Sequence, residues 1–298
     1  MAEVAIDTAE RLPRPARPAA WHLPTFGLRP AVLLGPLLLF LAAFYVYPVG
    51  AMMWRSVGDP HLTTANYTAL FTTDIYGLVF WITLRISLVT TVVALLLGYP
   101  VAYCLARLPP ARANLLLILV LIPFWTSILV RTYAWMVLLG RDGVINRLLL
   151  ALGVIEAPLR LLNTTFAVYV AMVHVLLPFM ILPLFATIRG IDPQLLRAAA
   201  SLGSRPAAAF RQVLLPLSLP GVFAGCLLVF ILALGFFITP ALVGGPRDLM
   251  IAILIDQQVE TLHWPFASAL AVVLLVAAVG SFALLGKALG VERMYGKA

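Results

Sequence analysis

Two arginines lie in long apolar stretches, where an ionised side chain is costly unless it faces water or other protein groups. Arg131 stands in the run PFWTSILVRTYAWMVLLG, and Arg85 lies near the start of an earlier apolar run. A charged side chain at the centre of a bilayer costs roughly 2.5–3.5 kcal/mol on insertion scales. Two interpretations of Arg131 stay open: it faces a polar path inside a bundle, or it reaches the membrane surface beside Tyr133 and Trp135. The surface position is favoured for Arg85.

Aromatic and acidic side chains would be the groups that serve a cationic solute. Tryptophan and tyrosine rings attract cations through their π faces, and Asp256 and Glu260 could supply carboxylates. Arg131 and the arginines between residues 141 and 160 would instead repel a cation, and helix packing is the alternative role of the rings. The residues that we expect along a solute path are Trp125, Arg131, Tyr133, Trp135, Thr239 and Asp256.

Motifs for catalysis, metal binding or nucleotide binding are missing from the sequence. It contains no HExxH, no G-x-x-x-x-G-K-[ST], no G-x-G-x-x-G and no G-x-S-x-G. The four histidines are scattered, and Cys104 and Cys226 lie in separate apolar segments, where we expect buried free thiols. We therefore expect this chain to hold no metal or cofactor and not to be an enzyme. Any ATP site must lie on another chain.

The composition indicates a polytopic membrane protein. Hydrophobic residues make up 63% of the chain and charged residues only 11%, and the mean hydropathy is +1.04. A soluble domain has closer to half apolar and a quarter charged residues. The net charge of +8 is therefore taken to reflect which side of the membrane the lysines and arginines lie on. It does not indicate a nucleic-acid partner, and none is expected.

Six apolar stretches are long enough for the roughly 20 residues that a membrane crossing requires. We expect the fourth to be interrupted by Pro178 and Pro183, the fifth by Thr239 and Pro240, and the third to be bent by Pro123. A short surface helix is expected within 55–76, and an amphipathic stretch along the outer interface over 144–152. The spans run approximately over 31–54, 77–106, 113–140, 165–188, 217–243 and 265–288.

The predicted organisation is an all-α membrane protein with both termini in the cytoplasm. With the N-terminus inside, 13 lysines and arginines lie on the cytoplasmic side and five outside, which satisfies the positive-inside rule. The expected segments are a disordered tail, a first span with its outer loop, a transmembrane domain and a cytoplasmic tail, over 1–30, 31–76, 77–288 and 289–298.

The longest helical run between two spans covers residues 191–216, IDPQLLRAAASLGSRPAAAFRQVLLP. Asp192 is a good N-cap, with proline at the first helical position. Gly203 suits the left-handed position that ends a helix. Ser204 is expected to cap a second helix, which Pro216 stops. The sequence thus predicts two short amphipathic helices joined at one glycine, which we call the elbow.

The elbow resembles the cytoplasmic coupling loop of permease subunits in type I ATP-binding-cassette importers. The family pattern Glu-Ala-Ala, three residues, Gly, nine residues, Ile-x-Leu-Pro keeps every spacing here, but Arg197 replaces the usual glutamate. In that family the loop docks into a groove on the ATPase. The resemblance implies a coupling set in which Leu202, Phe210 and Val213 anchor the elbow to the span ends: Arg197, Ala198, Ala199, Leu202, Gly203, Phe210, Val213 and Pro216.

Further motifs resemble the spermidine/putrescine branch of these permeases. They are PFW at 123–125, RTYAW at 131–135, GRDGVIN at 140–146, FITPALVGG at 237–245 and HWPF at 263–266. The resemblance implies a polyamine path with six spans, in a bacterial cytoplasmic (inner) membrane. It also implies a cytoplasmic ATPase dimer, a second homologous permease subunit and an extracytoplasmic solute-binding protein as partners.

Other functions stay open at this point. The same branch includes importers of opines, phosphonates, iron and amino-acid-like solutes. A carrier driven by an ion gradient would need carboxylates within the membrane or an internal repeat, and the sequence shows neither. A membrane-embedded enzyme would need a group of catalytic residues, and the sequence shows none of the motifs that would supply one.

Overall fold

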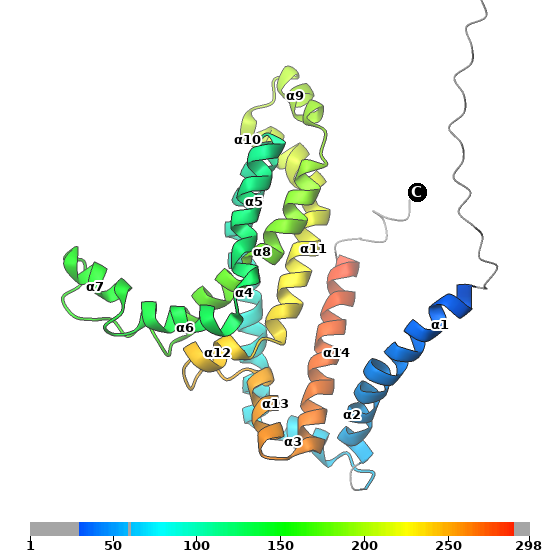
Figure 1. Ribbon diagram of the computed structural model, residues 1–298. Coiled ribbons are helices and arrows are strands. Elements are labelled where there is room, and N and C mark those ends of the chain that lie inside the picture. Colours follow the sequence, from blue (N-terminus) through cyan, green and yellow to red (C-terminus); the bar gives the residue numbers. More distant parts are fainter. Residues whose placement is uncertain (1–29, 59–60, 289–298) are drawn as a thin grey trace, which may run out of the picture. The chain divides into compact units, whose positions relative to one another are not determined.

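The computed structural model describes residues 30–58 and 61–288, with side chains at 34–58 and 61–283. Every regular element in these ranges is a helix (Figure 1). The chain divides into two compact units, Met1–Gly50 and Ala51–Ala298. The tails expected at 1–30 and 289–298 lie outside the described residues, except for Pro30.

The first predicted span is helical in the structure. It comprises α1 (Pro30–Leu41), a π-helical turn η1 (Ala42–Val46) and α2 (Tyr47–Gly58). The N–H of Tyr47 donates to the carbonyl of Ala42, five residues back. Proline has no N–H, and its ring crowds the carbonyl four residues earlier. The wider turn just before Pro48 makes room for that ring.

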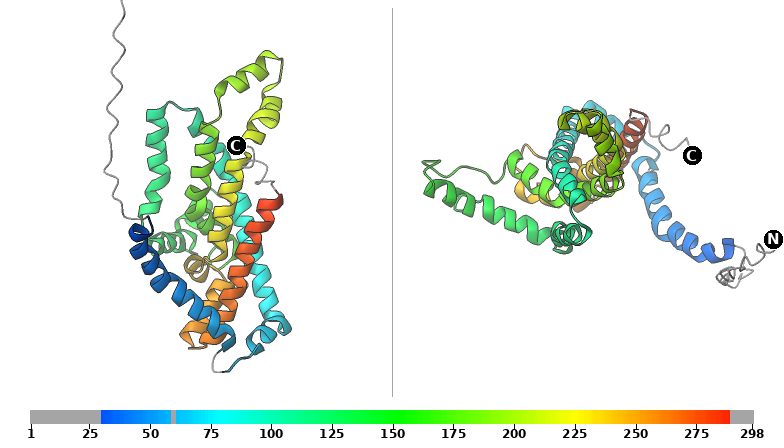
Figure 2. Two further views of the ribbon diagram at one scale, coloured as in Figure 1. Left: turned by 90° about the vertical axis from the view of Figure 1, so that its right-hand side faces the viewer. Right: turned by 90° about the horizontal axis from the view of Figure 1, so that it is seen from above.

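Three long helices form the core of the second unit: α4 (Asp74–Arg107), α8 (Thr165–Arg189) and α11 (Leu215–Leu234). They lie side by side, as the end-on view in Figure 2 shows. Their contact surfaces are mainly apolar, and Ile86, Met172 and Val229 are among the most enclosed side chains. Because lipid tails are as apolar as these side chains, the hydrophobic effect does not drive helices together in a membrane. Their packing depends instead on close approach of the backbones.

Two glycines permit that close approach between α8 and α11. A Cβ atom on Gly221 would lie 2.6 Å from the hydroxyl oxygen of Thr187, and one on Gly225 would lie 2.8 Å from the sulfur of Met180. Real Cβ atoms essentially never approach so closely, so a larger residue at Gly221 would press on Thr187 and on the backbone of Pro183, and one at Gly225 would force the flexible Met180 side chain to move. The backbones of α8 and α11 are therefore nearer to each other than larger residues would allow.

Prolines do not interrupt α8. Pro178 and Pro183 both lie within one continuous helix, so the expected interruption of the fourth span is wrong. Pro178 is itself buried, and α4 and α11 pack along the same helix. Neighbouring helices of this kind allow proline within a membrane helix.

The third predicted span is broken. α5 (Pro110–Trp125) is followed by α6 (Ile128–Leu139), and the helices on the two sides of Thr126 and Ser127 are bent by 92°. Thr126 closes the end of α5 by donating its hydroxyl to the carbonyl of Pro123, at 2.7 Å. The bend expected at Pro123 is therefore present, but it lies three residues later and breaks the helix. Among the described residues, five unbroken helical runs are long and apolar enough to span a membrane, or six spans if this bent pair is one of them.

The fifth predicted span has different ends in the structure. The helical run begins at α10 (Pro206–Ala209), passes through a π-helical turn η2 (Phe210–Leu214) and continues as α11, so Pro216 does not stop a helix. As in η1, the wider turn lies just before a proline. The run ends at Leu234, and a separate α12 (Ile238–Val243) contains Pro240. The interruption expected at Thr239 and Pro240 is therefore present, but it lies earlier, at 235–237.

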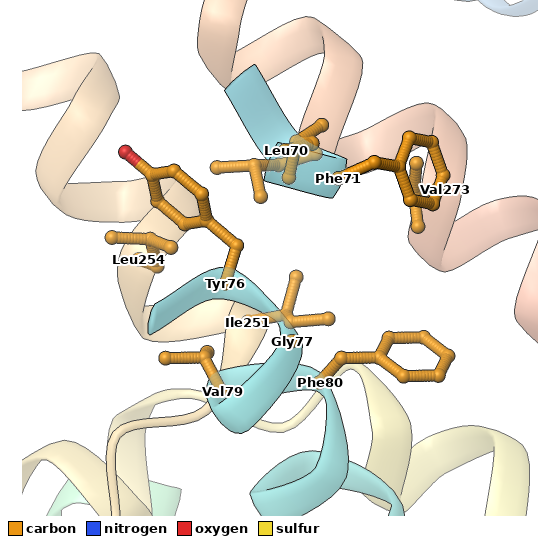
Figure 3. A pocket seen from close by; sticks show the side chains of 10 residues that line it. Leu70, Phe71, Tyr76, Gly77, Val79, Phe80, Ile251, Leu254 and Val273 are labelled. Carbon is orange, nitrogen blue, oxygen red and sulfur yellow. The ribbon is translucent and has the colours of Figure 1, made fainter. Parts of the chain in front are cut away.

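Two short helices and one long helix pack around the end of α4 that is farther from the elbow: α3 (Ala65–Thr72), α13 (Ile251–Glu260) and the long α14 (Trp264–Ala288). α3 confirms the short helix expected within 55–76. The hydroxyl of Thr83 on α4 accepts the N–H of Ile251 at 2.9 Å and thereby fixes the start of α13. A cavity of about 140 Å³ lies among these helices, lined by apolar side chains such as Phe80 and Leu254 (Figure 3).

Asp248 is a buried carboxylate that ties the loop before α13 to the start of α8. It is 2% exposed. One carboxylate oxygen accepts the hydroxyl of Thr165 at 2.5 Å, and the other accepts the N–H of Gly245 at 2.9 Å. A buried carboxylate with both oxygens bonded stabilises the loop that it closes.

Replacing Asp248 by alanine should lower the stability of the protein. The change leaves the Thr165 hydroxyl and the Gly245 N–H without their acceptor, at a cost of about 2 kcal/mol. We expect a lower midpoint of thermal aggregation for the detergent-purified protein. Asp256→Ala is the control, because Asp256 is exposed on α13. Equal midpoints for the two variants would contradict the structural role of Asp248.

Candidate functional site

The elbow follows α8 and begins as the sequence predicts. α9 (Pro193–Ser201) is capped by Asp192, whose carboxylate accepts the N–H of Gln194 at 2.8 Å. Gly203 has a φ of 81°, a left-handed conformation that favours glycine. The N–H of Ser204 returns to the carbonyl of Ala199 at 3.0 Å and closes the end of α9. The glycine bend between two helices is therefore confirmed.

The second helix of the elbow starts one residue later than expected. Arg205 occupies the N-cap position of α10, with Pro206 as the first helical residue. The hydroxyl of Ser204 bonds to the carbonyl of Arg205, at 3.5 Å, and caps no N–H group. The expected cap at Ser204 is therefore wrong, because Pro206 lacks the N–H group that an N-cap side chain at position 204 would approach first.

The elbow projects beyond the ends of α8 and α11 (Figure 1). Leu202 is 88% exposed, so it does not anchor the elbow to the rest of the chain as we expected. Leu196 packs against the core instead. Arg197 and Ala198 are exposed, and Ala199 is half-buried. An exposed leucine at such a bend leaves an apolar side chain free to contact another molecule.

Phe210 connects the elbow to α4. Its ring meets the rings of Tyr99 and Tyr103 edge-on, with centroids 5.9 and 6.4 Å apart. The hydroxyl groups of Tyr99 and Ser218 bond to each other at 2.9 Å, which joins α4 to α11 as well. Val213 is half-buried and Pro216 is exposed. A displacement of the elbow would therefore act on α4 and α11 together.

A second polar cluster lies where α6 contacts α8 and α12. The indole N–H of Trp135 donates to Nδ1 of His174 at 3.2 Å, and the hydroxyls of Thr132 and Thr239 bond to each other at 3.0 Å. The Nε atom of Arg131 is enclosed and has no hydrogen-bond partner among the described residues. That enclosure supports the interpretation in which Arg131 faces the bundle.

The residues expected along a solute path are only partly brought together. Arg131, Trp135 and Thr239 all belong to the cluster around α6, but Thr239 is fully buried and bonded to Thr132. Thr239 therefore cannot contact a solute in this conformation. Trp125 is 87% exposed at the end of α5. Two further residues expected along the path are exposed and lie elsewhere: Tyr133 on α6 and Asp256 on α13.

His174 is a member of this cluster that the sequence did not single out. It is the only residue of 165–188 that is a histidine or a charged type, and this isolation was the available signal. Because Nδ1 accepts the Trp135 N–H, it carries no proton, and the neutral ring holds its proton on Nε2. The cluster therefore offers one N–H donor and one enclosed cation to a ligand.

A third polar feature is a cavity of about 490 Å³ near α7 (Val144–Ala151), lined in part by Arg141 and Arg160. Asn146 fixes its rim, because the fully buried amide bonds to the carbonyls of Gly140 and Leu159 and to the N–H of Leu159. α7 confirms the helix expected over 144–152. Within the described part of the chain, no group of three metal-binding side chains converges.

Comparisons with known proteins agree with these features. Residues 94–286 match the family described as binding-protein-dependent transport system inner membrane component. The spermidine/putrescine transport system permease protein PotB of Haemophilus influenzae is 41% identical, over 78% of this chain and 77% of its own. The inner membrane ABC transporter permease protein YdcU of Escherichia coli is 35% identical, over 85% and 87%.

A solved structure shows the same fold. It is a bacterial alginate ABC transporter in complex with an alginate pentasaccharide-bound periplasmic protein. One of its chains has a TM-score of 0.73 and 16% identity, with 90% of this chain and 94% of that chain covered. The family match, the relatives and the elbow between two apolar helices lead to one assignment: this chain belongs to the binding-protein-dependent transport system inner membrane components, and it is a multi-pass inner-membrane permease of the ABC importer type.

Proposed function

We propose that this permease forms the membrane path of an ATP-driven importer for a polyamine. The observation that carries the proposal is its 41% identity with a spermidine/putrescine permease, over 78% of this chain. Polyamines are flexible cations, which aromatic faces can attract. Trp125 and Tyr133 are both largely exposed and available for that purpose. The other solutes of the branch are the alternatives.

The cluster around α6 makes the choice of solute testable. Arg131 carries a positive charge and would repel an ammonium group that came near, whereas it would attract a carboxylate or a phosphonate. In our proposal the polyamine therefore passes along the exposed rings, and Arg131 stays within the protein. An anionic solute would instead contact Arg131 directly.

Uptake measurements distinguish these solutes. Cells that lack polyamine importers and express this permease with its neighbouring transport genes should accumulate radiolabelled spermidine. Unlabelled putrescine should compete, and an amino-acid-like opine or a phosphonate should not. Uptake of one of the anionic solutes, without uptake of spermidine, would overturn the polyamine proposal.

We propose that the elbow lies in the cytoplasm and couples the spans to a partner ATPase. The elbow connects the core helices α8 and α11 directly, and it presents an exposed leucine at its bend. The ATPase forms a dimer, a second permease subunit completes the path, and a solute-binding protein delivers the polyamine from outside. Closure of the ATPase dimer moves both elbows and rocks the spans between inward-open and outward-open states.

Replacing Phe210 by alanine should weaken this coupling. The change removes two edge-on aromatic contacts with α4, each contributing about 0.5–1.5 kcal/mol beyond its buried area. We expect spermidine uptake to fall about fivefold at equal protein abundance, while the partner ATPase still hydrolyses ATP. Phe282→Ala is the control, because Phe282 is 54% exposed on α14. Unchanged uptake would mean that the Phe210 contact does not carry the motion.

A further inference from the structure

The exposed surface of the elbow is cationic. Asp192, Arg197 and Arg205 are the charged residues between positions 192 and 205, and all three are exposed. The carboxylate of Asp192 already accepts the N–H of Gln194 as the cap of α9. These two arginines, together with the exposed Arg211 farther along the elbow, therefore dominate the charge that the elbow presents to another molecule.

Two other arginines at the same end of the bundle are held by the chain itself. The guanidinium of Arg107 lies over the ring of Tyr103, 4.8 Å from its centroid. Arg189 lies over Phe185 at 5.6 Å and donates to the carbonyl of Leu108 at 3.3 Å. These contacts fix Arg107 and Arg189 against the bundle. The elbow arginines differ because they stand on a segment that projects from it.

Of the two arginines on either side of the glycine bend, Arg197 is the better placed for a close contact. It lies in the middle of α9, next to the exposed Ala198, and the hydroxyl of Ser201 bonds back to its carbonyl at 3.1 Å. Small neighbours let a partner surface reach the helix and enclose the guanidinium. Arg205 lies at the N-cap of the following helix, where it has a proline beside it.

An arginine that becomes enclosed in an interface needs a counter-charge. Desolvating an unpaired guanidinium costs several kcal/mol, whereas a carboxylate pairs with it through two parallel hydrogen bonds. Like charges across an interface are strongly unfavourable. The chemistry of the elbow therefore fits a groove that carries an acidic side chain and an apolar wall for Leu202.

We propose that the partner ATPase presents an aspartate or glutamate carboxylate to Arg197 in the groove that receives the elbow. The inference rests on the proposed function, since it assumes that the elbow docks on an ATPase. Beyond that function, the inference specifies that the docking site on the ATPase is acidic. An ATPase with a basic residue at that position should therefore not couple to this permease.

Zero-length crosslinking tests the contact. Arg197→Lys keeps the positive charge and supplies an amine, which a carbodiimide joins to a carboxylate only when the two groups touch. The tagged permease is purified with the ATPase that accompanies it, the complex is treated with the carbodiimide, and the linked peptide is identified by mass spectrometry. Arg112→Lys is the matched control, because Arg112 is exposed near the start of α5, outside the elbow.

We expect the Arg197→Lys complex, and not the Arg112→Lys complex, to yield a permease–ATPase crosslink. Arg197→Glu should lower spermidine uptake about tenfold, and changing the crosslinked acid to lysine should restore it. An Arg197→Glu variant with full uptake, or a complex that contains the ATPase but gives no crosslink at position 197, would overturn the inference. If no ATPase accompanied the wild-type permease, the proposed function itself would fail.

Discussion

Replacing Gly203 by aspartate should abolish uptake without reducing the amount of permease in the membrane. A Cβ atom at Gly203 meets no heavy atom within 4 Å, so the folded chain has room for the side chain. The left-handed φ of 81° costs a non-glycine residue about 1–2 kcal/mol, and aspartate tolerates it better than most. A negative side chain at the bend would, however, enter the surface that we assign to the ATPase.

Gly153→Asp is a closely matched control for this prediction. Gly153 ends α7 with a φ of 67° and also has open space around its Cβ position. The N–H of the next residue, Val154, returns to Leu149 at 3.0 Å, the same pattern that closes α9. The local cost should therefore be the same in both variants, so radiolabelled uptake should be lost only in Gly203→Asp. Full uptake and full ATPase stimulation in that variant would exclude the elbow as the joint.

Replacing Gly221 by leucine should prevent the protein from folding. The new side chain would meet Thr187 at 2.6 Å and the backbone carbonyl of Pro183 at 3.0 Å, and a backbone group cannot rotate away. Overpacking costs about 1–3 kcal/mol even where side chains can move. We expect the amount of folded permease, measured by fluorescence-detected gel filtration, to fall at least tenfold.

Gly280→Leu controls for the change in side-chain volume. Gly280 lies in α14, and a Cβ atom there meets no heavy atom within 4 Å. Its yield should be close to that of the wild type, and Gly221→Ala should fall between the two leucine variants. A Gly221→Leu protein with wild-type yield would show that α8 and α11 do not pack as closely as described.

The sequence predicted the helical spans well because hydropathy averages over about 20 residues. The breaks between and within spans depend on single backbone groups and were predicted poorly. Pro123 indicated a bend in the third span, but the apolar run continues across Thr126, so nothing in its hydropathy marks the position or the 92° angle of that bend. Conversely, Pro178, Pro183 and Pro216 suggested interruptions that packing and a π-helical turn absorb.

The elbow was predicted more accurately than the polar cluster around α6. Asp192 and Gly203 act through local backbone conformation, which their residue types largely determine. The pairing of Trp135 with His174 joins residues 39 positions apart and depends on how α6 packs against α8. The burial of Thr239 depends on the same packing. No spacing rule along one sequence contains that information.

The glycine contact between α8 and α11 has a mechanical consequence. Two rods bound along their length resist bending far more than either rod alone, and each helix here is about 30–37 Å long at 1.5 Å per residue. A force applied at the elbow should therefore tilt α8 and α11 together as one rigid body, with little bending of either helix. Two residues that lack a Cβ atom would thus supply the rigidity that the proposed coupling requires.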